Sequence, residues 1–396
     1  MRISTVTFQN DALFQMEALQ AAMAKTQGQL SSGKKLQSAA DNPSGMAQVN
    51  QLNVQLSASN QYVTNQNAAT ANLQLEEQAM SDATNTLQSA RDLAVQANNP
   101  ALSAQQRQDI SKQLQQQLQD LVAIGNRQDS NGNYLFGGTA AGTTPFSQAG
   151  GSVTYGGSSQ VNQVQISANQ RISAGDSGAS VFMNIPAGNG TFTTAAANTN
   201  VGTASIGPGT VTNAAAWVPD TYTVTFTTPT QYTVTNSGGT TVASGAYTDG
   251  DSISFNGVSV QVSGTPAAND TFTVAPAGKA SVFSTLNGLI TTLNSAGMNN
   301  GQLATRIGNA LQQIDGAVTN LSNVSAAVGA RINSITAAQS TERSTQTNLQ
   351  TQVSQLSDVD YAAAITQLST QELSLQAAQL SYASIAKLSL FNYLHP

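Results

Sequence analysis

The sequence of 396 residues contains no cysteine and one histidine, and only 9% of its residues are charged. Without cysteine, disulfide bonds, thiolate metal sites and cysteine nucleophiles are excluded. The histidine, His395, is next to last, where chains are commonly poorly ordered, so we expect a tail residue rather than a catalytic one. Fourteen lysines and arginines face twenty aspartates and glutamates, and no basic run is longer than Lys34-Lys35. This balance argues against nucleic acid as a partner.

Long apolar runs are missing as well. No apolar run of about 18 residues occurs, so we expect no membrane-spanning helix and no membrane partner. The first twenty residues lack the continuous apolar core of a secretory signal. This predicts a protein that is cytoplasmic or is exported without a cleaved signal peptide.

The strongest pattern that is present is an apolar heptad repeat in the second half of the chain. Its steps of three and four residues are typical of a helix that packs along one seam. At 1.5 Å per residue, residues 307–356 would form a helix of roughly 75 Å, longer than one compact core requires. Such a helix needs partner helices. The predicted long-helix seam consists of Ile307, Leu311, Ile314, Val318, Leu321, Val328, Ile332 and Ile335.

Three glycines, Gly308, Gly316 and Gly329, lie inside this long helix. Each costs about 1 kcal/mol of helix stability relative to alanine. Two interpretations are open: the glycines are tolerated, or they allow a neighbouring helix to approach closely.

Two further helical segments lie near the ends of the chain. A heptad from Met16 to Leu30 stops at Gly33, a typical helix end. The final helix, after Asp358, has apolar residues on more than one face, which favours an assembly over a monomer. From these segments we predict an assembly interface formed by Met16, Leu19, Met23, Leu30, Leu368, Leu373, Leu380, Leu388 and Phe391.

Between the helical ends, the pattern changes to strands and turns. Residues 143–278 contain alternating apolar side chains, and Asn256-Gly257 between two such runs is a strong hairpin signal. The Thr- and Ala-rich stretch 191–216 is expected to be an irregular loop. The predicted fold class is therefore α+β: a long antiparallel helical bundle or coiled coil formed by both chain ends, with an inserted antiparallel β-rich outer domain.

Motifs for catalysis are weak. Gly175-Asp176-Ser177-Gly178 resembles the nucleophile loop of trypsin-like proteases, but that fold needs a histidine upstream. We interpret these four residues as a polar turn. No glycine motif for binding phosphate or dinucleotides occurs. We therefore expect no enzyme activity, no cofactor and no metal site.

The segment Gln29–Gly45 closely resembles the N-terminal signature of bacterial flagellins and their relatives. Val328–Arg331 and Asp358–Ala362 resemble the C-terminal signature of the same family, in the same order. Asn131–Gly138 and Gln371–Tyr382 are more similar to the hook-associated members than to flagellin. The family-signature loop comprises Ser32, Gly33, Ala39, Ala40, Asp41, Asn42, Pro43 and Gly45.

This resemblance implies a non-enzymatic adaptor at the hook–filament junction of the bacterial flagellum, exported through the flagellar type III channel. The partners it implies are copies of the chain in a ring, FlgK, flagellin and, before secretion, an FlgN-like export chaperone. It also implies three domains. These are a terminal inner layer (1–43 with 357–396), a long-helix bundle (44–142 with 279–356) and the β-rich outer domain (143–278).

Two other functions remain open at this point. The chain could be flagellin, the subunit of the filament, which would be present in many copies and would grow long filaments when purified. It could instead be a secreted adhesin whose β-rich domain binds ligands on a helical stalk. An adhesin normally needs an anchor, and neither end of the sequence supplies an apolar segment of that kind.

Overall fold

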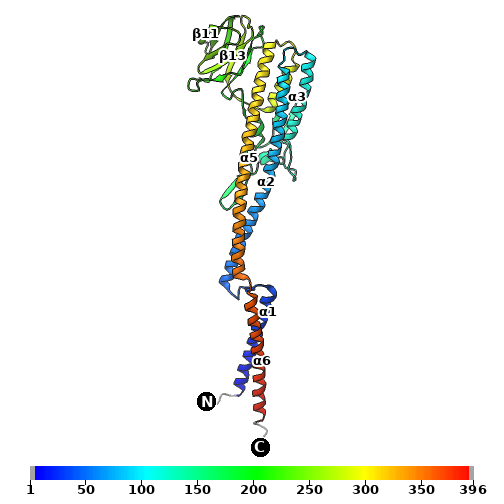
Figure 1. Cartoon of the computed structure of the whole chain (residues 1–396), viewed down its shortest axis with the longest axis vertical. Helices are drawn as coiled ribbons and strands as arrows, with labels where there is room; N and C mark the ends of the chain where they lie inside the picture. Colours follow the sequence, from blue (N-terminus) through cyan, green and yellow to red (C-terminus); the bar gives the residue numbers. More distant parts are fainter. Residues whose placement is uncertain (1–4, 392–396) are drawn as a thin grey trace. The chain divides into compact units, whose positions relative to one another are not determined.

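The computed structural model describes residues 5–391, with the side chains of residues 7–384. The chain divides into two compact units. We call residues up to 64 together with those from 339 onward the terminal unit, and Asn65–Ala338 the central unit. Figure 1 shows the first and last helices, α1 and α6, side by side within the terminal unit. The predicted α+β class is confirmed by long helices at both ends and antiparallel strands between them.

The helix boundaries follow local sequence signals. α1 stops where Gly33 adopts a left-handed conformation, with φ +69°, and α2 stops immediately before Asn98-Asn99-Pro100. α3 begins with a capping box formed by Ser103 and Gln106. Within residues 5–391 the α-helices are α1 (Thr5–Ser32), α2 (Pro43–Ala97), α3 (Ala104–Gly125), α4 (Val282–Asn294), α5 (Asn300–Ser357) and α6 (Tyr361–Phe391).

In the described part of the chain, all strands lie in the central unit, within residues 146–280. The largest sheet has five antiparallel strands in the order β11-β10-β9-β14-β6. The strands are β1 (Phe146–Ala149), β2 (Ser152–Tyr155), β3 (Gln163–Ser167), β4 (Gln170–Ser173), β5 (Ile185–Pro186), β6 (Phe192–Ala196), β7 (Ser205–Ile206), β8 (Thr210–Val211), β9 (Tyr222–Thr228), β10 (Gln231–Thr235), β11 (Thr241–Ala246), β12 (Ser252–Phe255), β13 (Val258–Ser263), β14 (Thr271–Pro276) and β15 (Lys279–Ala280).

Two expectations about this region meet different outcomes. The hairpin at Asn256-Gly257 is confirmed: both residues have positive φ, and they join β12 to β13. The expectation that 191–216 is an irregular loop is wrong in part. β6, β7 and β8 lie there, and β6 pairs with β14 along its whole length. The stretch lacks a periodic apolar pattern, so only its pairing with a distant strand reveals it as β structure.

The central unit contains two separate apolar cores. One core joins side chains of α2, α3, α4 and α5 with residues from the following strands and turns, including Phe146, Phe182 and Ile185. The other core is formed only by residues between Phe192 and Val274. The segment up to Ile185 is therefore packed with the helices, whereas 192–274 forms a β-rich body of its own.

The predicted heptad of α5 determines which side chains are buried in the central unit. Every seventh residue is fully buried, at Ile307, Ile314, Leu321, Val328 and Ile335. The other seam positions, Leu311, Val318 and Ile332, are half-buried against the same core. Side chains of α2 in this core follow a seven-residue spacing as well, at Leu73, Met80, Leu87 and Ala94. All eight predicted seam residues thus contact the chain's own core.

A second face of α5 carries polar side chains that hold the chain between β4 and β7. The amide of Gln302 donates to the carbonyl oxygens of Ala197, Asn198 and Asn200 at 2.9–3.2 Å. Further along α5, each of the other members of this face bonds to residues of 173–198. We call this set the α5 polar row: Gln302, Arg306, Asn309, Gln313, Asn320 and Arg331.

The three glycines of α5 have different surroundings. No described atom would lie within 4 Å of a Cβ at Gly308 or Gly329, so both glycines are tolerated within the chain itself. A Cβ at Gly316 would meet Ile185 Cγ2 at 3.9 Å and the Pro186 oxygen at 4.0 Å. The close neighbour at Gly316 is therefore strand β5 rather than another helix.

The α5 polar row predicts the effect of removing one amide. Gln302→Leu should lower the free energy of opening of segment 192–206 by about 1–3 kcal/mol, because buried carbonyl oxygens lose their donor. Hydrogen exchange of peptides from that segment measures this energy. Gln350→Leu, at an exposed position of the same helix, is the matched control and should change the energy by less than about 0.5 kcal/mol. Equal effects of the two changes would show that the row does not hold this segment.

Candidate assembly surface of the terminal unit

The pair formed by α1 and α6 is held by a half-buried apolar stripe and a buried threonine. Thr26 donates to the Ala22 oxygen at 3.0 Å within its own helix and to Gln371 Oε1 of α6 at 3.1 Å. The two helices lie in contact (Figure 1). Five of the predicted interface residues are half-buried in this pair, namely Met16, Leu19, Met23, Leu30 and Leu368.

Other apolar side chains of the pair point to solvent. Leu373 and Leu380 are 68% and 74% exposed, although both were predicted at an interface. Phe14 is 76% exposed; it was not among the predicted interface residues because it falls outside the heptad phase of α1. The exposed apolar set of this helix pair is Phe8, Leu13, Phe14, Tyr361, Ile365, Leu373 and Leu380. Leu388 and Phe391 lie beyond the side chains that the structure describes.

This exposed set is accompanied by few charges. α6 carries only Glu372 and Lys387, and α1 carries only Asp11, Glu17 and Lys25. A surface that is apolar and weakly charged pays little electrostatic repulsion when a similar surface approaches it. A helix pair that exposes seven large apolar side chains is typical of a site of protein–protein contact. The helix pair therefore offers a surface suited to packing against further helices.

The two family signatures meet at the base of this pair. Lys34 and Asp358 form an isolated antiparallel bridge between the chain segments. The Lys35 amide donates to the Ser357 oxygen at 2.7 Å, and the Val359 amide donates to the Gly33 oxygen at 3.0 Å. The signature residues thus join the two ends of the chain through backbone hydrogen bonds, which do not depend on side-chain identity.

Ion pairs accompany the backbone hydrogen bonds between residues 33–35 and 357–359, which we call the joint. Lys34 Nζ lies 2.7 Å from Asp358 Oδ1, and this contact, together with hydrogen bonds from Ser354 and Ser357, lowers the pKa of Asp358 to about 2. Lys25 Nζ lies 2.7 Å from Asp41 Oδ1. This contact and the backbone amide of Ser38 lower the pKa of Asp41 to about 2. Both aspartates are half-buried, but their lysine partners are 53% and 49% exposed, so we treat these pairs as positioning contacts rather than as large stabilising terms.

The rest of the signature loop starts α2. The Asn42 side chain accepts from the Gly45 amide at 3.0 Å, and Pro43 occupies the first helical position, where its missing N–H costs nothing. Gly45 is buried, and a Cβ there would lie 2.8 Å from Asn42 Nδ2. Ser32 accepts from the Lys34 amide at 3.2 Å. Ala39 and Ala40 are exposed.

The structure thus separates the three predicted groups of residues. The signature loop and five predicted interface residues come together in the terminal unit, whereas the long-helix seam lies in the core of the central unit. Within residues 7–384, no three His, Asp or Glu side chains are grouped as a metal site requires. None of the helices in the described part of the chain combines the length and apolar character needed to cross a bilayer.

We expect opposite effects from two glycine substitutions, one at the joint and one in α5. Gly33→Ala should destabilise the joint by about 1–2 kcal/mol, because an L-residue is strained at φ +69°. Its Cβ would also lie 3.0 Å from the Tyr361 hydroxyl. Gly308→Ala, in an uncrowded helical position, should instead stabilise α5 by about 0.4–1 kcal/mol. Hydrogen exchange around each site gives both energies, and stabilisation by Gly33→Ala would contradict the strained conformation.

Comparison with known proteins gives matches at both ends and in the middle of the chain. Residues 3–141 match the model of the bacterial flagellin N-terminal helical region, and residues 311–394 match that of the C-terminal helical region. Residues 193–276 match the D2-like domain of flagellar hook-associated protein 1. Flagellar hook-associated protein 3 of Salmonella typhimurium is 31% identical over 185 residues, which are 47% of this chain and 58% of that protein.

Solved structures extend the similarity over more of the chain. Xanthomonas campestris FlgL is 31% identical, with a TM-score of 0.72, and the match covers 76% of this chain and 99% of that one. The flagellar junction protein FlgL from Legionella pneumophila is 31% identical, with a TM-score of 0.70, over 78% of this chain and 100% of that one. Together with the paired signatures and the fold, these matches show that the chain belongs to the flagellin-related family of hook-associated proteins that includes FlgL.

Proposed function

We propose that the chain is a non-enzymatic structural adaptor of the bacterial flagellum that joins the hook side to the flagellin filament. The observation that carries this proposal is the exposed apolar set of α1 and α6, above all Leu373 and Leu380. Two helices can cover only one face of each other, so a helix that is apolar on several faces needs further partners. Membership in the FlgL family supports a flagellar place for those partners.

The proposed assembly has three layers. Residues 1–43 with 357–396 form an inner layer with the same segments of neighbouring copies, arranged in a ring. Residues 44–142 with 279–356 form a second layer, and 143–278 forms an outer domain. In this outer domain, 143–187 is anchored on the helices and 188–277 contains the separate β-rich core. The proposed neighbours of the ring are FlgK on the hook side and flagellin on the filament side.

Before assembly, the terminal helices would also have to be kept from associating too early. An exposed apolar surface on a soluble chain favours premature association, so a chaperone that covers it would keep the chain monomeric. We propose an FlgN-like export chaperone in the cytoplasm for this role, followed by export through the flagellar channel to the extracellular flagellum. The surface that the chaperone covers would then become the surface of the junction.

Leu380→Asp tests the assembly surface. The change should leave the fold of the isolated chain intact, because Leu380 is 74% exposed. It should abolish hook capping, since each buried leucine is worth roughly 1.5–3 kcal/mol and a buried aspartate costs more still. The readouts are the circular dichroism of the purified protein, the motility of a complemented deletion strain, and the amounts of attached and shed flagellin.

The control for this experiment is Gln379→Asp, which adds the same charge at the neighbouring exposed polar position. We expect the control strain to be motile. Normal filament attachment with Leu380→Asp would contradict the assignment of this face to the assembly. If the purified chain instead grew long filaments alone, the chain would be a filament subunit.

Excision of 188–277 tests the proposed outer position of the β-rich body. The cut is possible because the Ala187 amide donates to the Gly278 oxygen at 2.9 Å, so the two ends lie side by side. With a short flexible linker, the helical core should remain folded and the junction should still form. A loss of junctions despite proven export would show that this body takes part in the assembly.

The longer excision of 143–278 tests whether residues 143–187 are needed for the stability of the helices. It also removes Phe146, Phe182 and Ile185 from the helical core, so we expect a large loss of helix stability in thermal unfolding. A binding assay with cells and glycans separates the adaptor from an adhesin. The adaptor should not bind them, whereas an adhesin would bind them and would lose this binding upon the shorter excision.

A further inference from the structure

A group of two carboxyls and one guanidinium connects α2, the turn after β4 and α5 in the central unit; Glu76 is buried, whereas Asp176 and Arg331 are half-buried. Glu76 Oε1 of α2 accepts from the Asp176 amide at 3.0 Å. The Arg331 guanidinium of α5 pairs with the Asp176 carboxylate and donates to the Gly175 oxygen at 3.2 Å. The turn Gly175–Gly178 is therefore more than a polar turn: it is clamped between the two long helices.

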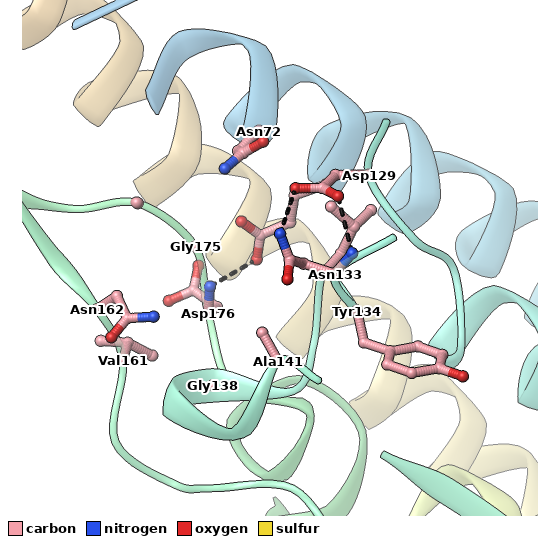
Figure 2. Close-up of a pocket in the computed structure, with 13 residues that line it drawn as sticks. Asn72, Asp129, Asn133, Tyr134, Gly138, Ala141, Val161, Asn162, Gly175 and Asp176 are labelled. Carbon is pink, nitrogen blue, oxygen red and sulfur yellow. Dashed lines mark hydrogen bonds between the residues drawn. The ribbon is translucent and has the colours of Figure 1, made fainter. Parts of the chain in front are cut away.

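Figure 2 shows the cavity beside this clamp, with the hydrogen bond that the Asp176 amide donates drawn as a dashed line. The cavity has a volume of about 220 Å³ and is lined by Glu76 and by polar groups such as Asn72 and Asn162. Glu76 is 1% exposed, and its Oε2 atom has no hydrogen-bond partner among the described residues. The turn lies beside this oxygen: a Cβ at Gly175 would be in ordinary van der Waals contact with it, at 3.6 Å.

The charges of the clamp do not balance when every group is ionised. Two carboxylates then share one guanidinium, and Arg331 pairs with Asp176 rather than with Glu76. A buried carboxylate without its own counter-charge is costly, and the cost disappears when the carboxyl takes up a proton. Burial, and next the charge of Asp176, raise the pKa of Glu76 to about 8, against smaller opposing effects of Arg331 and of the hydrogen bond from the Asp176 amide.

Among the described residues, Arg331 is the one positive charge that acts on Glu76. Asp176 faces it from the turn, Arg331 from α5, and Asp129 lines the same cavity from the loop after α3. Asp129 accepts from the amides of Asn131 and Asn133 at 2.8 and 2.9 Å, so its own loop holds it in place. The cavity wall thus adds negative charge near Glu76.

We propose that Glu76 is a proton-binding switch of the central unit: it holds a proton at neutral pH, and loss of this proton loosens the turn Gly175–Gly178 from α2. The cavity provides the water through which the proton is exchanged. Arg331 keeps the turn on α5 when α2 releases it, so the opening is local. This proposal concerns one chain and is independent of the proposed flagellar function.

The direction of the pH effect follows from the two protonation states. An ordinary glutamate loses its proton near pH 4.5, whereas folded Glu76 keeps it up to about pH 8. The folded state therefore binds more protons in this window, and its stability falls as pH rises through it. One proton corresponds to a tenfold change in the opening equilibrium per pH unit, or roughly a thousandfold over the window.

The test is hydrogen exchange of peptides that cover 173–178 and α2 in the full chain between pH 5 and 9, corrected for intrinsic exchange. The opening constant should rise about tenfold per pH unit up to pH 8 in the natural chain. Glu76→Gln should remove this rise. Glu77→Gln, at the exposed neighbouring position, is the matched control and should behave like the natural chain.

Infrared difference spectra supply a direct readout of the proton. At pH 7, the band of a protonated carboxyl should be present in the natural chain and in Glu77→Gln, and absent in Glu76→Gln. If Glu76→Gln fails to fold, Asp176→Asn keeps the proposal testable, because loss of the like charge should make the band disappear at a lower pH. A pH profile unchanged by Glu76→Gln, or no such band at pH 7, would overturn the proposal.

Discussion

The fold of the central unit depends on the burial of one apolar stripe of α5, whose residues recur every seven positions. Side chains from Ile307 to Ile335 that recur every seven residues are removed from water, each contributing roughly 1.5–3 kcal/mol. This burial fixes the rotation of the helix about its axis. The rotation in turn places the α5 polar row, from Gln302 to Arg331, along the chain between β4 and β7. One apolar stripe thereby decides where the β-rich body is attached.

The terminal unit also packs its helices along an apolar stripe, but a smaller part of its apolar surface is buried. α1 and α6 share a half-buried stripe, and exposed side chains such as Phe14 and Leu380 lie outside it. The signature loop holds the pair by backbone hydrogen bonds and by exposed ion pairs such as Lys34–Asp358. Such contacts set geometry at little cost but bury little apolar surface. In the proposed junction, further stability of this helix pair would come from the partners of the assembly.

Sequence patterns predicted the elements whose signals are local. The helix stop at Gly33 and the hairpin at Asn256-Gly257 each depend on a few neighbouring residues. β6 was missed because its partner β14 is some eighty residues further along the chain, as in the pairing of Phe192 with Pro276. A strand defined by a distant partner leaves a weak trace in a stretch rich in Thr and Ala.

By itself, the sequence determined the α+β class, the helical character of both ends and the family signatures, since periodicity and short motifs are properties of consecutive residues. Only the tertiary structure decided which apolar side chains of α6 stay exposed, and that Arg331 pairs with Asp176 while Glu76 is buried beside them. Exposure and ionisation depend on desolvation and on charges brought together from 76, 176 and 331. Residues that far apart meet only when the chain is folded.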